Sequence, residues 1–138
     1  MGEKSQRAFT LDEVNALIPR LEEYFKNFWS LRENAQHILE SLRAKDPEEM
    51  TALEAANYQM KSSQAHFLLE QARKEVNAIF DMGCAIKDFD IGLADFPHIL
   101  EDRNQEVHLC WKFGEKHVRF WHELDEGYAS RKPLLRQR

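Results

Sequence analysis

The sequence predicts an α+β fold: a long antiparallel hairpin of two helices, followed by a small antiparallel β-sheet with a C-terminal hairpin. Up to about residue 82, apolar residues recur every three or four positions, which is the spacing of one helix face. Beyond Gly83 they alternate with polar residues, as in half-buried strands. A chain of 138 residues, 43% of them hydrophobic, is the size of one domain. We therefore expect a single domain with a helical hairpin (10–82), a β-rich portion (83–126) and a basic C-terminal tail (127–138).

The first helix begins near Thr10, because Thr10 and Glu13 fit the capping box, in which two side chains satisfy the free amides of a helix start. Pro19 lacks the amide of a continuous helix and predicts a kink or break near 15–18. We expect the helix to continue to Ala44. Its apolar residues keep a heptad spacing: Leu11, Val14, Ile18, Leu21, Phe25, Phe28, Ala35, Leu39 and Leu42.

The second helix is expected from Pro47 to Met82, after a turn at 45–47, with Gly83 as its left-handed terminator. Its apolar residues fall into two phases. The first comprises Met50, Leu53, Ala56, Met60, Ser63 and Phe67, and the second comprises Leu68, Leu69, Ala72, Val76 and Ile79. Small and polar residues leave the middle of this helix under-filled, which favours a homodimer through the helices.

The β-rich portion contains one clear hairpin, between Asn104 and Leu124, with Gly114 and Glu115 as a two-residue loop. Residues 84–97 form either two short strands about Ile91-Gly92 or one strand and a turn. Pairing the clear hairpin through its two-residue loop gives an apolar face and a polar face. The apolar face holds Val107, Leu109, Trp111, Val118, Phe120 and His122, and the polar face holds His108, Cys110, Lys112, His117, Arg119 and Trp121.

Charge and composition narrow the class of protein. The net charge of −5 and pI of about 5.7 argue against a nucleic-acid partner. No segment has the apolar length of a membrane span or a signal peptide, so we expect no membrane association and a cytoplasmic location. The two cysteines are expected to be free thiols. The basic residues of the tail, expected to be solvated or frayed, are Arg131, Lys132, Arg136 and Arg138.

Four blocks of sequence carry a resemblance to a known family. They are FTLDEVNALIPRL (9–21), IKDFDIGLADFP (86–97), LCWKFGE (109–115) and FWHELDEGYASRKPL (120–134). Together they resemble the bacterial family called domain of unknown function 2203, over nearly the whole chain. Ser130 departs from the pattern, which would have a Gly before Arg131. The family has no assigned activity, so the resemblance implies no catalytic or binding residue.

The acidic residues of 86–97 form the first candidate site. In a hairpin about Ile91-Gly92, Asp88 falls opposite Asp95, and like charges that face each other destabilise a strand pair unless something offsets them. One interpretation is a salt-bridge cluster or a pair of hydrated carboxylates. The other is a polar pocket in which Arg119 and Asp88 or Asp95 bind a substrate.

The clear hairpin supplies the other candidates. His122 on the apolar face is either a core histidine or a general base. Trp121, on the polar face beside Arg119, suits a ligand platform. Cys110 and His108 lie two residues apart on one strand, too far for a direct hydrogen bond. The candidate ligand-binding residues are Asp88, Asp95, Cys110, Arg119, Trp121 and His122.

A metal site is the weaker alternative. Asp88, Asp95 and His122 are its candidate ligands, but Lys112 and Arg119 share a face with Cys110 and would repel a divalent cation. We expect no resident cofactor. With most of the chain in helices and no cofactor motif, the leading class is a non-enzymatic interaction or scaffold protein, dimeric and able to bind a protein partner. The alternative is a small-ligand or divalent-metal site at the sheet, hydrolysis being one activity it could support.

Overall fold

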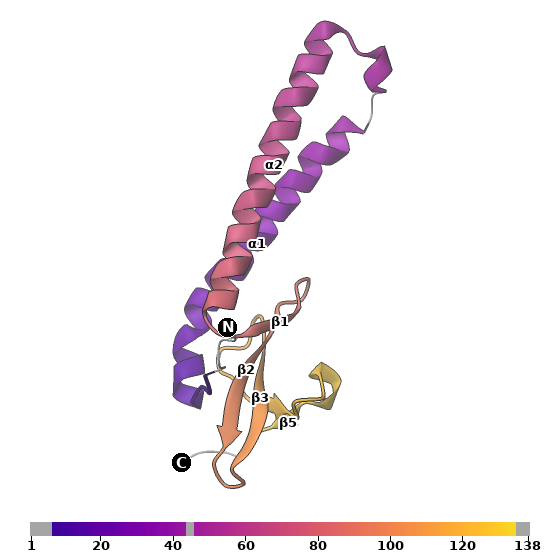
Figure 1. The fold of residues 1–138 in the computed structure, drawn as a ribbon. Helices are drawn as coiled ribbons and strands as arrows, with labels where there is room; N and C mark the ends of the chain where they lie inside the picture. Colours follow the sequence, from indigo (N-terminus) through magenta and orange to yellow (C-terminus); the bar gives the residue numbers. More distant parts are fainter. Residues whose placement is uncertain (1–6, 44–45, 135–138) are drawn as a thin grey trace, which may run out of the picture. The chain divides into compact units, whose positions relative to one another are not determined.

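The computed structural model describes residues 7–43 and 46–134 and confirms the α+β fold (Figure 1). The contacts within the chain divide it into two compact units. We call residues 24–78 the helical unit, and residues up to 23 together with those from 79 onward the β-rich unit. That the chain is a single domain stays a prediction. Ala44 and Lys45, at the predicted end of the first helix, and Arg136 and Arg138 of the tail lie outside the described residues.

The elements follow the predicted order. They are α1 (Leu11–Leu42), η1 (Pro47–Glu49), α2 (Ala52–Asp81), β1 (Ala85–Asp88), β2 (Leu93–Leu100), β3 (Gln105–Lys112), β4 (Phe120–His122), η2 (Tyr128–Ser130) and β5 (Lys132–Pro133). Within the described chain, neither long helix combines the length and apolar character needed to cross a membrane.

Two capping boxes set the starts of the long helices. At α1, the Thr10 amide donates to Glu13 Oε1 (2.9 Å) and the Glu13 amide donates to Thr10 Oγ1 (3.1 Å), as predicted. The same pair of bonds joins Thr51 and Glu54. The prediction that the second helix starts at Pro47 is therefore wrong: residues 47–49 form a separate 3₁₀ turn, and the capping box starts α2 at Ala52.

Pro19 does not interrupt α1, which is continuous from Leu11 to Leu42, so a break at 15–18 is wrong. The proline costs one backbone hydrogen bond. Ile18 and Leu21, on either side of it, are 4% and 0% exposed, and their packing keeps this part of the chain helical. At the end of α2, Gly83 has the predicted left-handed backbone (φ 102°), and its amide donates to the Phe80 carbonyl.

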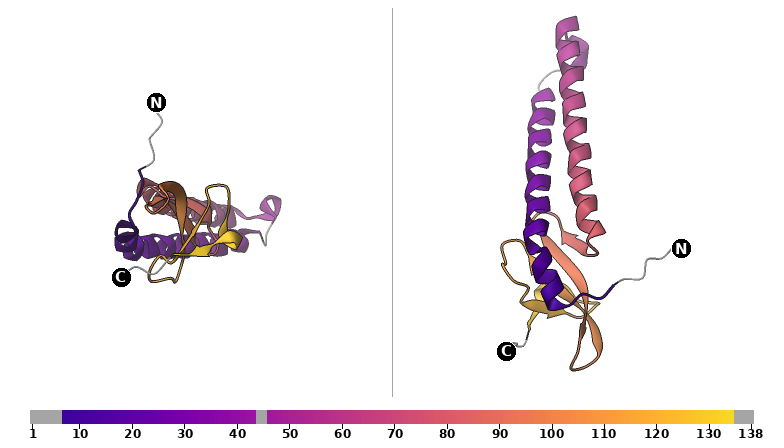
Figure 2. Two further views of the ribbon diagram at one scale, coloured as in Figure 1. Left: turned by 90° about the horizontal axis from the view of Figure 1, so that it is seen from below. Right: turned by 90° about the vertical axis from the view of Figure 1, so that its left-hand side faces the viewer.

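In the helical unit, α1 and α2 run side by side in opposite directions (Figure 2). Asn27 Nδ2 donates to Glu75 Oε1 (3.2 Å) across the pair. Of the two apolar phases of α2, the second continues the buried line through Ala65 and Ala72. The first phase faces outward instead, since Met60 and Phe67 are 57% and 62% exposed.

In the β-rich unit, five antiparallel strands form one sheet in the order β1-β2-β3-β4-β5. The first turns of α1 pack on one face of it. The Phe9 ring meets the Phe96 ring edge to face at 5.3 Å, and the Val118 amide donates to Asn15 Oδ1 (2.8 Å). The buried residues of this core include Phe9, Val14, Ile18, Leu21, Ile79, Phe96, Val107, Leu109, Trp111, Val118 and Trp121.

The segment 127–134 is part of the fold, so the expectation of a solvated or frayed tail is wrong for it. β5 pairs with β4, with Phe120 opposite Pro133 and Trp121 opposite Lys132. Arg131, just before β5, keeps only 9% of its side chain exposed. Arg131 and Lys132 therefore have partners within the β-rich unit, in Glu115 and Glu126.

Candidate metal centre

Residues 85–100 do form two strands, β1 and β2, but Asp88 does not face Asp95. The bulge in β1 places Asp88 opposite Leu93 and Ala85 opposite Asp95, which corrects the predicted register. Asp88 Oδ1 accepts hydrogen bonds from the amides of Asp90 (2.8 Å) and Ile91 (3.1 Å). The Asp88 carboxylate therefore stabilises the turn between the strands.

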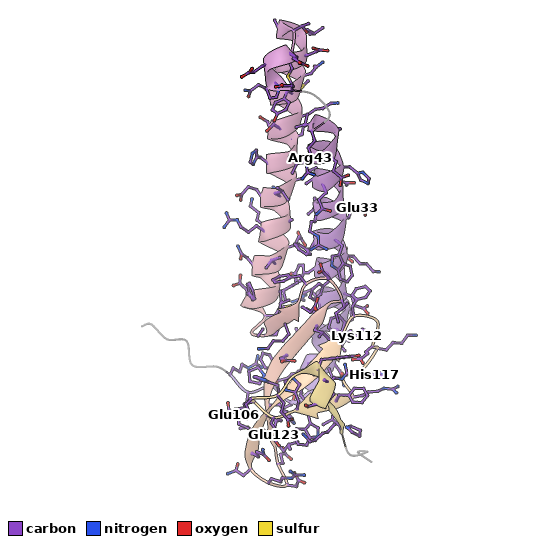
Figure 3. All side chains as sticks on the ribbon, turned by 90° about the vertical axis from the view of Figure 1, so that its right-hand side faces the viewer. Glu33, Arg43, Glu106, Lys112, His117 and Glu123 are labelled. Carbon is purple, nitrogen blue, oxygen red and sulfur yellow. The ribbon has the colours of Figure 1, made fainter. Side chains whose placement is uncertain are left out.

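The register of β3 against β4 differs by one residue from the prediction. His108 lies opposite His122 and Cys110 opposite Phe120. The predicted two-residue loop is replaced by a longer connection, because the Val118 amide bonds to Asn15 on α1 and the return strand begins only at Phe120. Figure 3 labels His117 in this connection, and Glu106 and Lys112 near the two ends of β3. A shift of one residue turns every side chain of β4 to the other face.

This shift changes the places of Trp121 and Arg119. Trp121 lies opposite Leu109 and is 6% exposed, with the Lys132 Nζ 4.8 Å from its ring centroid, so it is not an exposed platform. Arg119 is exposed, and its backbone carbonyl accepts from the Leu134 amide. Of the six predicted residues, only Asp95, Cys110 and His122 converge.

Asp95, Cys110 and His122 come from three neighbouring strands. Each is 1% exposed, and one ligand atom from each lies within 4.8 Å of the others. His122 Nε2 is 3.1 Å from Asp95 Oδ2, and His108 Nδ1 is 3.8 Å from the same oxygen. Among the described residues, neither Asp95 oxygen, nor His122 Nε2, nor His108 Nδ1 has a hydrogen-bond partner. Buried polar atoms rarely lack a hydrogen-bond partner.

The tautomer of His122 follows from the contact that its Nδ1 makes. Nδ1 lies 2.8 Å from the Glu123 backbone carbonyl, and because a carbonyl only accepts, Nδ1 must carry the hydrogen. In neutral His122, Nε2 then presents a lone pair to the Asp95 carboxylate. Two acceptors 3.1 Å apart in a buried site require a cation between or beside them. A proton on Nε2 would supply one and make the contact an ion pair, and a metal ion bound to both groups would supply another.

The thiol of Cys110 and the imidazole of His108 are held in their neutral forms. Burial and the Asp95 carboxylate raise the pKa of Cys110 to about 12, whereas Arg131 acts in the opposite direction. Burial lowers the pKa of His108, despite the nearby Asp95. A neutral imidazole is the form that binds a metal, while a thiol must lose its proton to do so.

Arg131 lies near this cluster and is part of the fold, although the sequence predicted it in a solvated tail. Its guanidinium Cζ lies 3.9 Å from the Phe120 ring centroid and 4.7 Å from that of Tyr128. Its Nη2 pairs with Glu115 Oε2 at 2.6 Å, its Nη1 is buried without a hydrogen-bond partner among the described residues, and its charge acts to lower the pKa of Cys110. A run of basic residues near the chain end resembles a solvated tail, and β5 is only two residues long, so no local pattern indicates this position.

The residues present fit a divalent transition metal. Thiolate, imidazole and carboxylate are the ligands of zinc, with bonds of about 2.0–2.3 Å and hence ligand atoms roughly 3.3–3.7 Å apart in a tetrahedron. The spread of up to 4.8 Å in the cluster needs a contraction of about 1 Å. Of the two positive charges that argued against a metal, Arg119 is exposed and lies outside the cluster, and Lys112 has its Nζ 6.0 Å from the Tyr128 ring centroid. Arg131 is the positive charge that acts on Cys110, and it is paired with Glu115. His108 lies beside the cluster, with its Nδ1 3.8 Å from Asp95 Oδ2.

Fold and site together define a class of protein: an α+β protein with a two-helix hairpin and a five-stranded sheet that encloses an Asp-Cys-His cluster. The chain belongs to the family of uncharacterized conserved proteins DUF2203, whose model matches residues 7–134. This confirms the resemblance noted in the sequence. No curated protein and no solved structure matches the chain.

Proposed function

We propose that the β-rich unit binds one divalent transition metal ion of the zinc class through Asp95, Cys110 and His122. The observation that supports this most is the buried approach of His122 Nε2 to Asp95 Oδ2, two acceptors that need a cation. A metal ion bound to Cys110 as thiolate, to Asp95 and to His122 would satisfy all three groups.

The site has the character of a structural centre. Its polar atoms are sealed from solvent, and a hydrolytic metal keeps an open position for water. The ligands lie on β2, β3 and β4, so a bound metal would join three strands and stabilise the sheet. His122 is held in the correct tautomer by the Glu123 carbonyl, as metal-binding histidines commonly are.

Metal analysis of the purified, untagged chain tests this proposal. We expect close to one zinc per chain and a melting temperature that rises with added Zn²⁺. His122→Gln should remove both effects. His117→Gln, at an exposed histidine in the connection before β4, is the matched control and should keep them. A wild-type chain that neither retains metal nor gains thermal stability from Zn²⁺, Co²⁺ or Ni²⁺ would contradict the proposal.

A second candidate function, a protein-interaction or scaffold role, belongs to the helical unit. The observation that favours it is the exposed first phase of α2, where Leu53, Met60 and Phe67 are 73%, 57% and 62% exposed. Exposed apolar surface of this kind commonly marks an interaction site. Pull-downs with wild type and Phe67→Glu test it: a partner protein retained by wild type and lost by the variant supports the role, and identical results for both count against it.

A further inference from the structure

The exposed apolar residues of α2 form a regular stripe. Leu53, Ala56, Met60, Ser63 and Phe67 are all exposed and follow one another at alternating steps of three and four residues. This is the spacing of the a and d positions of a coiled coil. We call these five residues the α2 stripe.

The α2 stripe is not used by the hairpin itself. In the heptad that places Leu53, Met60 and Phe67 at position a, the buried residues Ala65 and Ala72 occupy position f, on the opposite side of the helix. Packing against α1 therefore does not account for the apolar residues of the stripe.

A groove of about 510 Å³ runs beside the stripe, and its lining is mostly apolar. The lining residues are Ile38, Met60, Ser63, Gln64, Phe67 and Leu68. Ile38 comes from α1, so the groove can receive side chains of a helix laid along the stripe. A helix of matching pattern is the natural occupant of such a surface.

We propose that the α2 stripe pairs with the same stripe of a second copy of this chain, with the two α2 helices antiparallel. The inference rests on the interaction role proposed for the helical unit and names its partner. An interface that repeats the same patch on both copies is the commonest way in which soluble chains associate.

The distribution of charge selects the antiparallel direction. Glu48 and Glu49 lie exposed before the stripe, and Arg73 and Lys74 lie exposed beyond it. Antiparallel helices bring the acidic 3₁₀ turn before α2 of one copy towards Lys74 of the other, whereas Arg73 is already paired with Glu70. Parallel helices in register would place Lys74 against Lys74, which is repulsive.

Side-chain size agrees with this direction. The register that sets Met60 opposite Ser63 of the second copy also sets Ala56 opposite Phe67. Met60 and Phe67 each then meet a small residue, which allows close packing, while Leu53 at the end of the stripe lies opposite Glu70. In the parallel arrangement the two Phe67 rings would compete for one place, and the two Ser63 residues would leave a gap.

Multi-angle light scattering and sedimentation of the full chain test the proposal. We expect a dimer at micromolar concentration, and monomers for Met60→Glu and Phe67→Glu. Ala55→Glu adds the same charge at an exposed position of α2 outside the stripe and should remain dimeric. Circular dichroism confirms that each variant is folded, and Met60→Gln serves as a milder change if either glutamate variant fails to fold.

Charge exchange tests the direction. Glu49→Lys and Lys74→Glu should each weaken the dimer by about 2- to 30-fold, from the strength of two exposed ion pairs, and the double variant should restore it. A double variant as weak as the single ones would overturn the antiparallel arrangement. A wild-type chain that stays monomeric, or a dimer unaffected by Met60→Glu and Phe67→Glu, would overturn the proposal that the α2 stripe pairs with a second copy of the chain. The pull-down with Phe67→Glu still decides the wider interaction role, and the metal proposal is independent of both.

Discussion

His122 Nε2 lies 3.1 Å from Asp95 Oδ2, although the strands that carry them, β4 and β2, do not pair with each other. β3 lies between them and adds Cys110, opposite Asp95, and His108, opposite His122. Three strands thus enclose polar groups that are 1% exposed in Asp95, Cys110 and His122. The cation that this arrangement requires is the basis of the first prediction.

Asp95→Asn should abolish the stabilisation by zinc. At a zinc concentration about 100 times the dissociation constant, that stabilisation is roughly 2.7 kcal/mol in the free energy of unfolding. Asp88→Asn preserves the oxygen that accepts from Asp90 and Ile91, and should change the free energy of unfolding by less than about 0.5 kcal/mol. Chemical denaturation with and without zinc measures both. Equal responses of the two variants to zinc would count against Asp95 as a ligand.

Arg131→Ala should destabilise the fold by about 2–3 kcal/mol, because it removes a charged hydrogen bond to Glu115 and the contacts with two aromatic rings. Lys132→Ala is the adjacent control. Its ion pair with Glu126 is 43% and 33% exposed, so its loss should cost less than about 1 kcal/mol. Urea denaturation gives both values, and a larger loss for Lys132→Ala would show that Arg131 does not hold the C-terminal segment in place.

Cys84 should make the stability depend on alkaline pH. Burial raises its pKa from 9.0 to about 12, so between these values the folded chain holds a proton that the unfolded chain has lost. The free energy of unfolding therefore falls as pH rises through that window, by at most about 1.4 kcal/mol per pH unit for this thiol. Cys84→Ala should show a shallower decline in thermal or urea denaturation between pH 9 and 11. Parallel curves for the variant and wild type would refute this.

The capping box of α1 should stabilise the fold at neutral pH, and part of this stabilisation should be lost in acid. Thr10→Ala should cost about 1 kcal/mol, as losses of such caps commonly do. The hydrogen bond from the Thr10 amide lowers the pKa of Glu13 in the folded chain. The ionised Glu13 side chain therefore stabilises the fold above its pKa in the unfolded chain, and this stabilisation is lost as pH falls through its pKa in the folded chain. Glu13→Gln should flatten this acid limb of the stability curve. An unchanged limb would assign the acid dependence to other carboxylates.

Local signals in the sequence predicted much of the fold. The hydrogen bonds of Thr10 and Glu13, the left-handed backbone of Gly83 and the existence of the hairpins all depend on neighbouring residues, which sequence patterns report well. The start of α2 differs from the prediction because Asp46-Pro47 is itself a good helix start, whereas the capping box at Thr51 and Glu54 starts the helix at Ala52.

The candidate site was predicted only in part, because it depends on register. The chemistry of the side chains indicates Asp95, Cys110 and His122 as candidates. The hairpin register predicted from the sequence, however, puts His122 on the face away from Cys110. The bond from the Val118 amide to Asn15, distant in sequence, lengthens the loop and reverses the face of β4. The bulge in β1 likewise separates Asp88 from Asp95. Neither feature has a local sequence signal.

Titration of the metal-free chain with Co²⁺, followed by visible absorption, tests the central claim most directly. A tetrahedral site that contains a thiolate gives intense d–d bands and a sulfur-to-cobalt charge-transfer band. We predict both bands, saturating at one Co²⁺ per chain in wild type and in Cys84→Ser, with the charge-transfer band lost in Cys110→Ser. Absence of these bands in wild type, or their persistence in Cys110→Ser, would contradict a metal centre at Asp95, Cys110 and His122.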